Sequence, residues 1–487
     1  MITIDVLPDN VLLEIFSFYV VPQGPFRLWT MEAWQSLVHV CHRWRCVVFG
    51  SPRRLNLRLV CSPPTPVRDT LDVWPELPLL ILADVTVTQE GADKLDNVVA
   101  ALERSDRVDE IRLDYYQDSA MENVFAAMQV PLPKLVTMQI IRWKCNETAT
   151  AFPDSFLGGS APRLRDLYFW CIPFPGLPKL ILSATHLVNL TLQCIPHSGY
   201  FSPESIATAL STLISLENLF LNFLSPQCRP EWKSRRPPPL TRSVLPVLTS
   251  LAFKGDSEYI DDLVACIDTP RLFELNITFF NQVVFDTPQF IQFISRTPTL
   301  KDPEMAHVSF EYDSASVRLT SCSGDVRVQV RCREFDWRVS SMEQVCTWCL
   351  PPLSTLEDLY MEVQSWESDR QDNIENVLWL ELLQPFATVK NLYLSKNFAP
   401  YIVPALQELV GGRQTEVLPT LRNIFLEGLK PSGPVHEGIE KFVGMRQGPI
   451  AVSPFRRNQE IEESDEESDE DGLDDDEESD EDRSDGD

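Results

Sequence analysis

A hydrophobic pattern, Leu-x-x-Leu-x-Leu or a close variant, recurs along most of this 487-residue chain. Clear copies start at Leu164, Leu187, Leu216, Leu248, Leu272, Leu356 and Leu421, and weaker copies start at Val108, Leu135 and Val389. Neighbouring copies lie 23 to 33 residues apart, with one longer gap. A unit of this length cannot bury its apolar side alone, so the copies must stack on one another. The pattern therefore predicts a solenoid.

A helical period alternates with this strand pattern. Ser202 and Pro203 supply a helix cap and a first-turn proline, and apolar residues at helical spacing then precede a strand expected at 217–223. The same period predicts helices at 91–104, at 259–267, at 373–383 and after Pro288. The 56-residue gap between Leu300 and Leu356 spans about two periods, and alternating valines at 325–330 predict one degenerate copy there. Each unit is expected to be a helix, a turn and a short strand, so the fold class is α/β.

The residues between the strand leucines should point away from the core, onto an open face of the sheet. These positions mix aromatic and amide side chains, a combination that suits protein recognition. The residues expected to bind a protein substrate there are Tyr168, Trp170, Phe220, Asn222, Tyr360 and Tyr393. The alternative is that these aromatic side chains pack against loops that cross the face.

Residues 1–50 differ from the repeats and predict a small helical module. Leu7-Pro8-Asp9 begins one helix, and a second is expected at about 31–49. The first helix carries an apolar stripe of Val11, Leu12, Ile15, Phe16 and Tyr19, and the second carries Trp34, Leu37, Cys41, Trp44 and Val48. Two short helices have too little apolar surface for a core of their own. They must therefore dock on the first repeat or on another protein.

The segments LPDNVLLEIF and VCHRW resemble the two halves of an F-box. The segment that follows, up to about residue 85, is similar to fungal F-box proteins that carry leucine-rich-repeat-like bodies. The resemblance implies that the module docks on the Skp-type adaptor of a cullin-based SCF ubiquitin ligase, while the solenoid holds a protein substrate. The residues implied at the adaptor contact are Leu7, Pro8, Leu12, Ile15, Phe16, Val40, Cys41 and Trp44. The chain would be a non-catalytic receptor subunit.

Two features depart from that family. The link between the two helices, residues 20–33, is long. The repeats also lack the Asn or Cys expected three residues after each Leu-x-Leu, which only Asn397 supplies. Without an Asn or Cys at this position of each repeat, the repeats are still predicted to stack, but a regular horseshoe curvature is not predicted. The other reading of the module is an N-terminal cap of the solenoid, which repeat arrays require.

Charge divides the chain further. The net charge is −29, and residues 460–487 hold 19 acids against Arg483 alone, so the rest of the chain carries −11. An acidic body argues against nucleic acid as a ligand. The expected domains are 1–50 (helical module), 51–450 (leucine-rich-repeat-like solenoid) and 451–487 (disordered acidic tail). Ser464, Ser468 and Ser479 each precede three acids and are expected phosphorylation sites. The tail also suggests an alternative function, a ubiquitin-independent scaffold or chaperone for basic proteins.

The sequence also predicts several absences. We find no apolar run of 18 residues, hence no membrane span, and acids stand where an export signal would carry basic residues. A reducing location, cytoplasmic or nuclear, is therefore expected. The 12 cysteines are scattered, and the single Cys-x-x-Cys, Cys346 to Cys349, has no partner pair. We accordingly expect no metal, no cofactor and no catalytic site.

Overall fold

The computed structural model describes most of the chain outside the acidic tail. The described residues are 7–20, 33–64, 66–85, 95–145, 151–226, 242–280, 285–363, 374–409, 417–428, 433–446 and 449–455. The segment that carries Ser464, Ser468 and Ser479 lies outside them.

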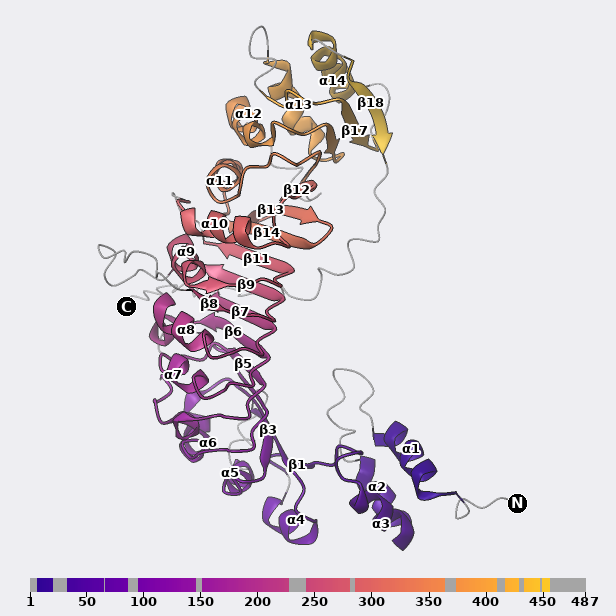
Figure 1. Cartoon of the computed structure of the whole chain (residues 1–487), viewed down its shortest axis with the longest axis vertical. Coiled ribbons are helices and arrows are strands. Elements are labelled where there is room, and N and C mark those ends of the chain that lie inside the picture. The colour runs from indigo at the N-terminus through magenta and orange to yellow at the C-terminus, as the bar shows by residue number, and fades with distance from the viewer. Residues whose placement is uncertain are drawn as a thin grey trace, which may run out of the picture.

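Across the described residues the protein is an α/β solenoid built on one long sheet (Figure 1). This sheet has 16 strands in the order β1-β2-β3-β4-β5-β6-β7-β9-β11-β14-β13-β12-β15-β16-β17-β18, and β8 and β10 form a separate pair. The strands are β1 (Leu59–Cys61), β2 (Leu79–Val85), β3 (Val108–Tyr115), β4 (Thr137–Arg142), β5 (Asp166–Trp170), β6 (Asn189–Ile195), β7 (Asn218–Phe223), β8 (Ser243–Val244), β9 (Ser250–Gly255), β10 (Ile267–Asp268), β11 (Glu274–Phe279), β12 (Met305–Phe310), β13 (Ser314–Ser321), β14 (Gly324–Arg331), β15 (Asp358–Val363), β16 (Asn391–Leu394), β17 (Asn423–Glu427) and β18 (Ala451–Phe455).

Three helices precede the first strand, and the later helices connect the strands and cover one face of the sheet. They are α1 (Asp9–Val20), α2 (Ala33–Val40), α3 (His42–Gly50), α4 (Val67–Val73), α5 (Asp96–Leu102), α6 (Asp118–Ala127), α7 (Leu177–Ile181), α8 (Pro203–Leu210), α9 (Ser257–Ala265), α10 (Pro288–Arg296), α11 (Phe335–Trp348), α12 (Asn376–Leu383), α13 (Ala399–Gln407) and α14 (Pro434–Met445). The stack bends into an arc with the helices outside and the open face of the sheet inside (Figure 1).

The repeated leucines form the core, as the pattern predicts. In β5, β6 and β7 the residues Leu167, Leu190 and Leu219 are register partners, and each is at most 1% exposed. The residues between the leucines are half-buried on the other face, which gives the alternating burial of each strand. Burying such a leucine contributes about 1.5–3 kcal/mol, so consecutive units hold one another together.

The long gap in the pattern is more complex than one degenerate copy. The strand predicted at 325–330 exists as β14, but β12 and β13 precede it. The strand β13 pairs antiparallel with both neighbours, so this part of the sheet runs in the order β14-β13-β12. The physical reason is that three alternating segments follow one another with only short turns between them, and a tight turn can join only antiparallel strands.

A polar ladder runs along the first position of several strands. The Asn189 side-chain amide donates to Asp166 at 2.5 Å and accepts from Asn218 at 2.7 Å. The same arrangement recurs at β15, β16 and β17 in the chain Asp358, Asn391 and Asn423, with distances of 2.6 and 2.7 Å. The role expected of an asparagine after each Leu-x-Leu is thus taken by the residue directly before the second leucine of the Leu-x-x-Leu-x-Leu pattern.

The structure differs from the predicted boundaries in the N-terminal module and at the C-terminal end of the solenoid. The single helix expected at 31–49 is two helices, α2 and α3, because Cys41 adopts an extended backbone (φ −158°, ψ 168°) and caps α3. At the other end the sheet continues past residue 450, since β18 pairs in parallel with β17. Residues 451–455 therefore belong to the sheet.

Candidate functional site

The N-terminal module is held together by one side of α1. Leu12, Leu13 and Phe16 are at most 8% exposed, and the Phe16 ring lies 4.7 Å from the Trp44 ring of α3. An aromatic pair at this distance adds about 0.5–1.5 kcal/mol to the area that it buries. Leu12 and Phe16, two of the predicted adaptor contacts, are thus core residues of the module.

The module is anchored to the solenoid through α2. Trp34 is fully buried, and its indole N–H donates to the carbonyl oxygen of Arg58 at 3.1 Å. Its ring meets that of Trp74, at the end of α4, at a centroid distance of 5.2 Å. The apolar side of α2 is therefore covered by this chain and is not available to a partner.

Polar contacts fix the beginning of α1. The Arg43 guanidinium pairs with Asp9 at 2.7 Å and donates to the carbonyl oxygen of Leu7 at 2.5 Å. At the start of α3, the Trp44 N–H donates to the Cys41 thiol sulfur at 3.5 Å. Leu7, Cys41 and Trp44 are half-buried, and Pro8 is exposed.

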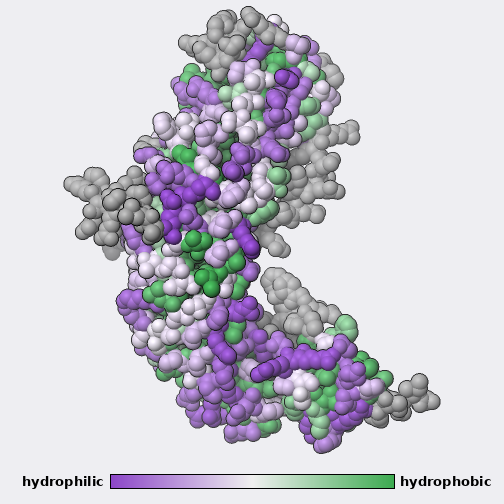
Figure 2. All heavy atoms as spheres, in the orientation of Figure 1, coloured by the Kyte–Doolittle hydropathy of each residue, from purple (hydrophilic) through white to green (hydrophobic). Residues whose placement is uncertain are grey.

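A second apolar face of α1 is left uncovered by the described residues. Its side chains recur at helical spacing, and their exposed fractions are 37% for Val11, 44% for Ile15, 78% for Phe18 and 55% for Tyr19. Figure 2 shows hydrophobic side chains gathered over this end of the module. Val40, at the end of α2, is 59% exposed. We call Val11, Ile15, Phe18 and Tyr19 the outer face of α1.

The predicted adaptor contacts therefore divide into three groups, one of which is the half-buried set of Leu7, Cys41 and Trp44. Leu12 and Phe16 build the module, whereas Pro8, Ile15 and Val40 lie on its surface. Phe18 was missed, because the predicted stripe joined residues of both faces and did not include Phe18. The signal was present in the i, i+4, i+7 spacing of Val11, Ile15 and Phe18, which continues on a face separate from that of Leu12 and Phe16.

The second candidate surface is the open face of the sheet. Tyr168 and Trp170 lie on β5 and Phe220 and Asn222 on β7, with β6 between the two strands. All four side chains are half-buried. No hydrogen-bond partner among the described residues reaches the Asn222 Oδ1, which is a buried, unsatisfied acceptor.

Tyr360 and Tyr393 belong to a different cluster, on β15 and β16, and five strands of the sheet separate β15 from β7. Their rings are stacked with centroids 4.0 Å apart, and Tyr393 stacks in turn on Phe425 at 4.5 Å. His307 and Phe455 flank this stack at 6.3 and 5.5 Å. We call Tyr360, Tyr393 and Phe425 the aromatic column. The predicted substrate residues thus form two clusters, and Phe425 was missed although it occupies the matching position of its repeat.

Burial governs the ionisation of the tyrosines on this face. It raises the pKa of Tyr360 to about 12, with the neighbouring Tyr393 as the second cause. It also raises the pKa of Tyr168 to about 12, followed by the effects of Cys194 and Asp114. These phenols therefore keep their protons at neutral pH and can donate hydrogen bonds to a partner.

Carboxylates crowd the N-terminal part of the open face. Asp84 and Asp114 are register partners on β2 and β3. Burial, followed by the charge of Asp84, raises the pKa of Asp114 to about 6, while Arg112 acts in the opposite direction. This end of the face is acidic and suits a cationic segment better than an anionic one.

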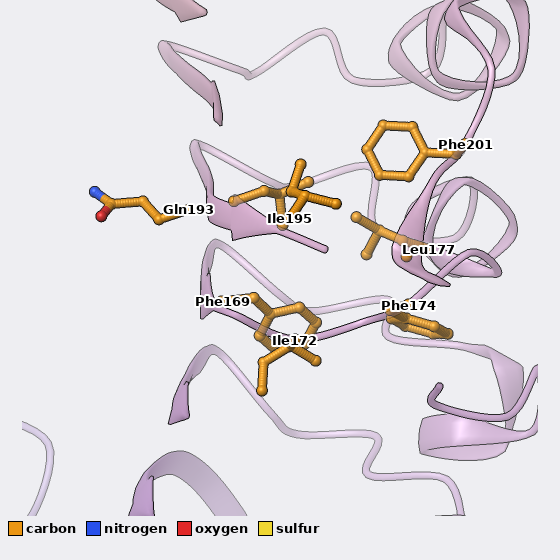
Figure 3. Close-up of a pocket in the computed structure, with 9 residues that line it drawn as sticks. Phe169, Ile172, Phe174, Leu177, Gln193, Ile195 and Phe201 are labelled. Atoms are coloured by element: carbon orange, nitrogen blue, oxygen red, sulfur yellow. The ribbon is translucent and has the colours of Figure 1, made fainter. Parts of the chain in front are cut away.

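Two hollows among the described residues differ in size and shape. The first, of about 10 Å³, lies where Phe169, Leu177 and Phe201 converge, while Gln193 points away from it (Figure 3). It is large enough for about one water molecule at most and is a packing gap. The second is an open depression of about 670 Å³ at the strand starts, which includes Arg163, Arg165 and His186. Its openness suits a protein contact rather than an enclosed ligand.

Comparisons with known proteins add little. No family model matches the chain, and no curated protein matches it. Among solved structures, the leucine-rich repeat-containing protein LegL7 from Legionella pneumophila is similar over 80% of this chain and 99% of its own, at 10% identity and a TM-score of 0.26. So low a score carries no argument, and the description of the fold rests on strand order and register. No helix in the described parts of the chain has the length and apolar character needed to cross a bilayer.

Proposed function

We propose that this protein is a substrate-recruiting subunit of an SCF-type ubiquitin ligase. The module α1–α3 would bind the Skp-type adaptor, and the arc of the solenoid would hold a protein substrate. The observation that carries the proposal is the outer face of α1, where Phe18 is 78% exposed although the opposite face of the same helix is fully packed. A helix needs only one apolar face to dock on its own chain, so a second one indicates a partner.

The chemistry of this face fits a groove on another protein. Its apolar side chains recur at i, i+4, i+7 and i+8, the spacing by which an amphipathic helix enters a groove. The F-box resemblance includes the same helix and implies that Ile15 contacts the adaptor. Supporting contacts from Arg43 and Trp44 hold α1 in place, which lowers the entropic cost of binding.

The substrate side of the proposal rests on the inner surface of the arc. The module sits at the N-terminal end of the stack, on the side of the strands rather than of the outer helices (Figure 1). A protein held along the strands would therefore lie on the same side as the adaptor. The chain would act by proximity, and the chemistry would belong to the ubiquitin-conjugating enzyme.

Co-purification with the Skp-type adaptor tests the proposal. The variant Ile15→Asp/Phe18→Asp places two charges on the outer face of α1 and should abolish adaptor capture. The control is Ile214→Asp, since Ile214 is also apolar and 64% exposed but lies in the turn after α8. Both variants should keep the native melting temperature. Unchanged capture by a folded Ile15→Asp/Phe18→Asp protein would overturn the assignment.

The acidic tail motivates a second candidate function. A net charge of −18 over residues 460–487 suits a scaffold or chaperone for basic proteins. Deleting these residues should then abolish capture of a basic partner, and the binding that they mediate should weaken steeply with salt. If the deletion leaves the set of captured partners unchanged, this function is excluded and the receptor function is unaffected.

A further inference from the structure

Three cysteines from consecutive repeats meet beside the ends of β4, β5 and β6. The sulfur atoms of Cys145, Cys171 and Cys194 all lie within 4.8 Å of one another. Cys145 and Cys171 are 26 residues apart, and Cys194 follows at the 23-residue offset that also separates Asp166 from Asn189. The repeat length thus matches the cysteine spacing, and stacking of the repeats brings together residues that are scattered in the sequence.

The backbone at two of these cysteines is unusual. Cys171 and Cys194 have φ angles of 55° and 52°, in the left-handed region that residues with a Cβ rarely adopt. This conformation costs roughly 1–2 kcal/mol at each position. Cys194 also lies where the pairing of β6 with β7 shifts, between Leu192 and Ile195, and such bulges redirect side chains. Adjacent repeats thus adopt the same costly conformation at residues whose sulfur atoms meet.

The cluster is closed on one side and open on the other. Cys171 is 1% exposed and Cys194 is 7% exposed, whereas Cys145 is half-buried. In the structure Cys145 and Cys171 form a disulfide, and the thiol of Cys194 is the third sulfur. Reduction of this disulfide leaves three thiols, one from each of three repeats, with access to solvent beside Cys145.

We propose that the reduced cluster of Cys145, Cys171 and Cys194 binds one thiophilic divalent ion, with Zn²⁺ as the physiological candidate. Zinc–sulfur bonds of about 2.3 Å place ligand sulfurs roughly 4 Å apart. The three sulfur atoms already lie within 4.8 Å of one another, so opening the disulfide lets them reach this separation with a small movement. Three thiolates carry −3, which a divalent ion reduces to −1. A monovalent ion would leave −2, and uncompensated charge is costly at a buried site. A water molecule would complete the coordination on the open side.

The other pair of neighbouring cysteines differs in its chemistry. Burial raises the pKa of both Cys346 and Cys349, the latter to about 12. Cys349 donates its thiol to the carbonyl oxygen of Phe285 at 3.6 Å. In the described ranges no third ligand group joins this pair, and the three-cysteine cluster alone meets the spacing for a metal ion. Cys346 therefore provides a matched control for a buried cysteine outside the site.

The test uses the full chain, reduced under anaerobic conditions by a phosphine, which takes up one oxygen from water as the disulfide becomes two thiols. After removal of the phosphine, Cd²⁺ is titrated as a spectroscopic substitute for Zn²⁺. We expect one ion per chain, a sulfur-to-metal charge-transfer band, displacement of previously bound Zn²⁺ by the softer Cd²⁺ and a higher melting temperature of the loaded protein. Cys194→Ser should abolish the band, and Cys346→Ser should retain it.

Two further measurements keep the result unambiguous. If Cys194→Ser fails to fold, Cys145→Ser serves instead, because Cys145 is the least buried of the three, and it should also abolish the band. A reduced native chain that binds no Cd²⁺, or a folded Cys194→Ser protein that binds it as well as the native chain, would overturn the proposal. The cluster would then be only a structural disulfide with a buried neighbour. Adaptor capture is not involved in this test.

Discussion

The two faces of α1 differ in what covers them. The inner face, with Leu12, Leu13 and Phe16, is packed against α2 and α3, whereas the outer face is uncovered in the described chain. The open face of the sheet is intermediate, since its aromatic side chains are half-buried and stacked on one another. Exposure of a large apolar side chain thus indicates a partner on the helix, while on the sheet much of the same surface already contributes to the stability of the solenoid.

The largest expected effect separates the two faces of α1 by a matched pair of substitutions. Phe16 and Phe18 are the same residue type on one helix, 1% and 78% exposed. Phe16→Ala should lower the free energy of unfolding by about 3–5 kcal/mol, since it leaves a cavity beside Trp44. Phe18→Ala should change it by less than about 0.5 kcal/mol. Chemical denaturation measures both, and equal effects would contradict the division into two faces.

The aromatic column should give the next largest effect. Tyr393 lies between Tyr360 and Phe425, so Tyr393→Ala removes two stacked pairs and should cost about 1–3 kcal/mol of stability. Tyr393→Phe keeps both rings in contact and serves as the control. If this column also contacts the substrate, Tyr393→Ala will weaken substrate capture while adaptor capture stays intact. Equal stability of the alanine and phenylalanine variants would show that the stack contributes nothing.

The asparagine ladder should contribute less than the aromatic column. Asn189→Ala removes one hydrogen bond to Asp166 and one from Asn218. The expected loss of stability is about 1 kcal/mol, because both partners are near the surface and can turn to water. Thr191→Ala, on the same strand and the same face, is the control and should have a smaller effect. Thermal unfolding of the two variants gives the comparison.

The fourth expected effect concerns the acidic end of the open face and depends on pH. The pKa of Asp114 in the folded chain is about 6, above its ordinary value of 3.8. Between these values the folded chain binds more protons than the unfolded chain, so this group makes stability fall as the pH rises through the window. Asp114→Asn should therefore be more stable than the native protein above about pH 6 and equal to it below about pH 4. A pH-independent difference would contradict this assignment.

Much of the fold was predictable because each repeat places leucines and helix-starting residues at regular positions in the sequence. The leucines of each strand, the Ser202-Pro203 helix start and the strand at 325–330 all appear at the expected places. The antiparallel insertion was not predicted, since alternating residues indicate a strand but not its direction. The break at Cys41 was missed because the apolar spacing of Trp34, Cys41 and Trp44 continues across it.

The candidate surfaces were predictable in part. The alternation within each strand identified Tyr168, Tyr360 and Tyr393 as open-face residues, but the number of strands between them follows only from the order of the sheet. The spacing along α1 contains two apolar faces, but only packing decides which of them is covered. The cysteine cluster was missed for a related reason: residues one repeat apart are distant in sequence and adjacent in the stack.

The order of residues alone accounts for the periodicity, the alternation of helix and strand, the helix start at Leu7-Pro8-Asp9 and the negative charge of residues 460–487. These are local properties, set by side-chain chemistry over a few residues. Packing in three dimensions sets which apolar side chains remain exposed, which residues of different repeats lie side by side and where the strands reverse. Those outcomes depend on contacts between distant segments, since burial and register are properties of the whole stack rather than of any one repeat.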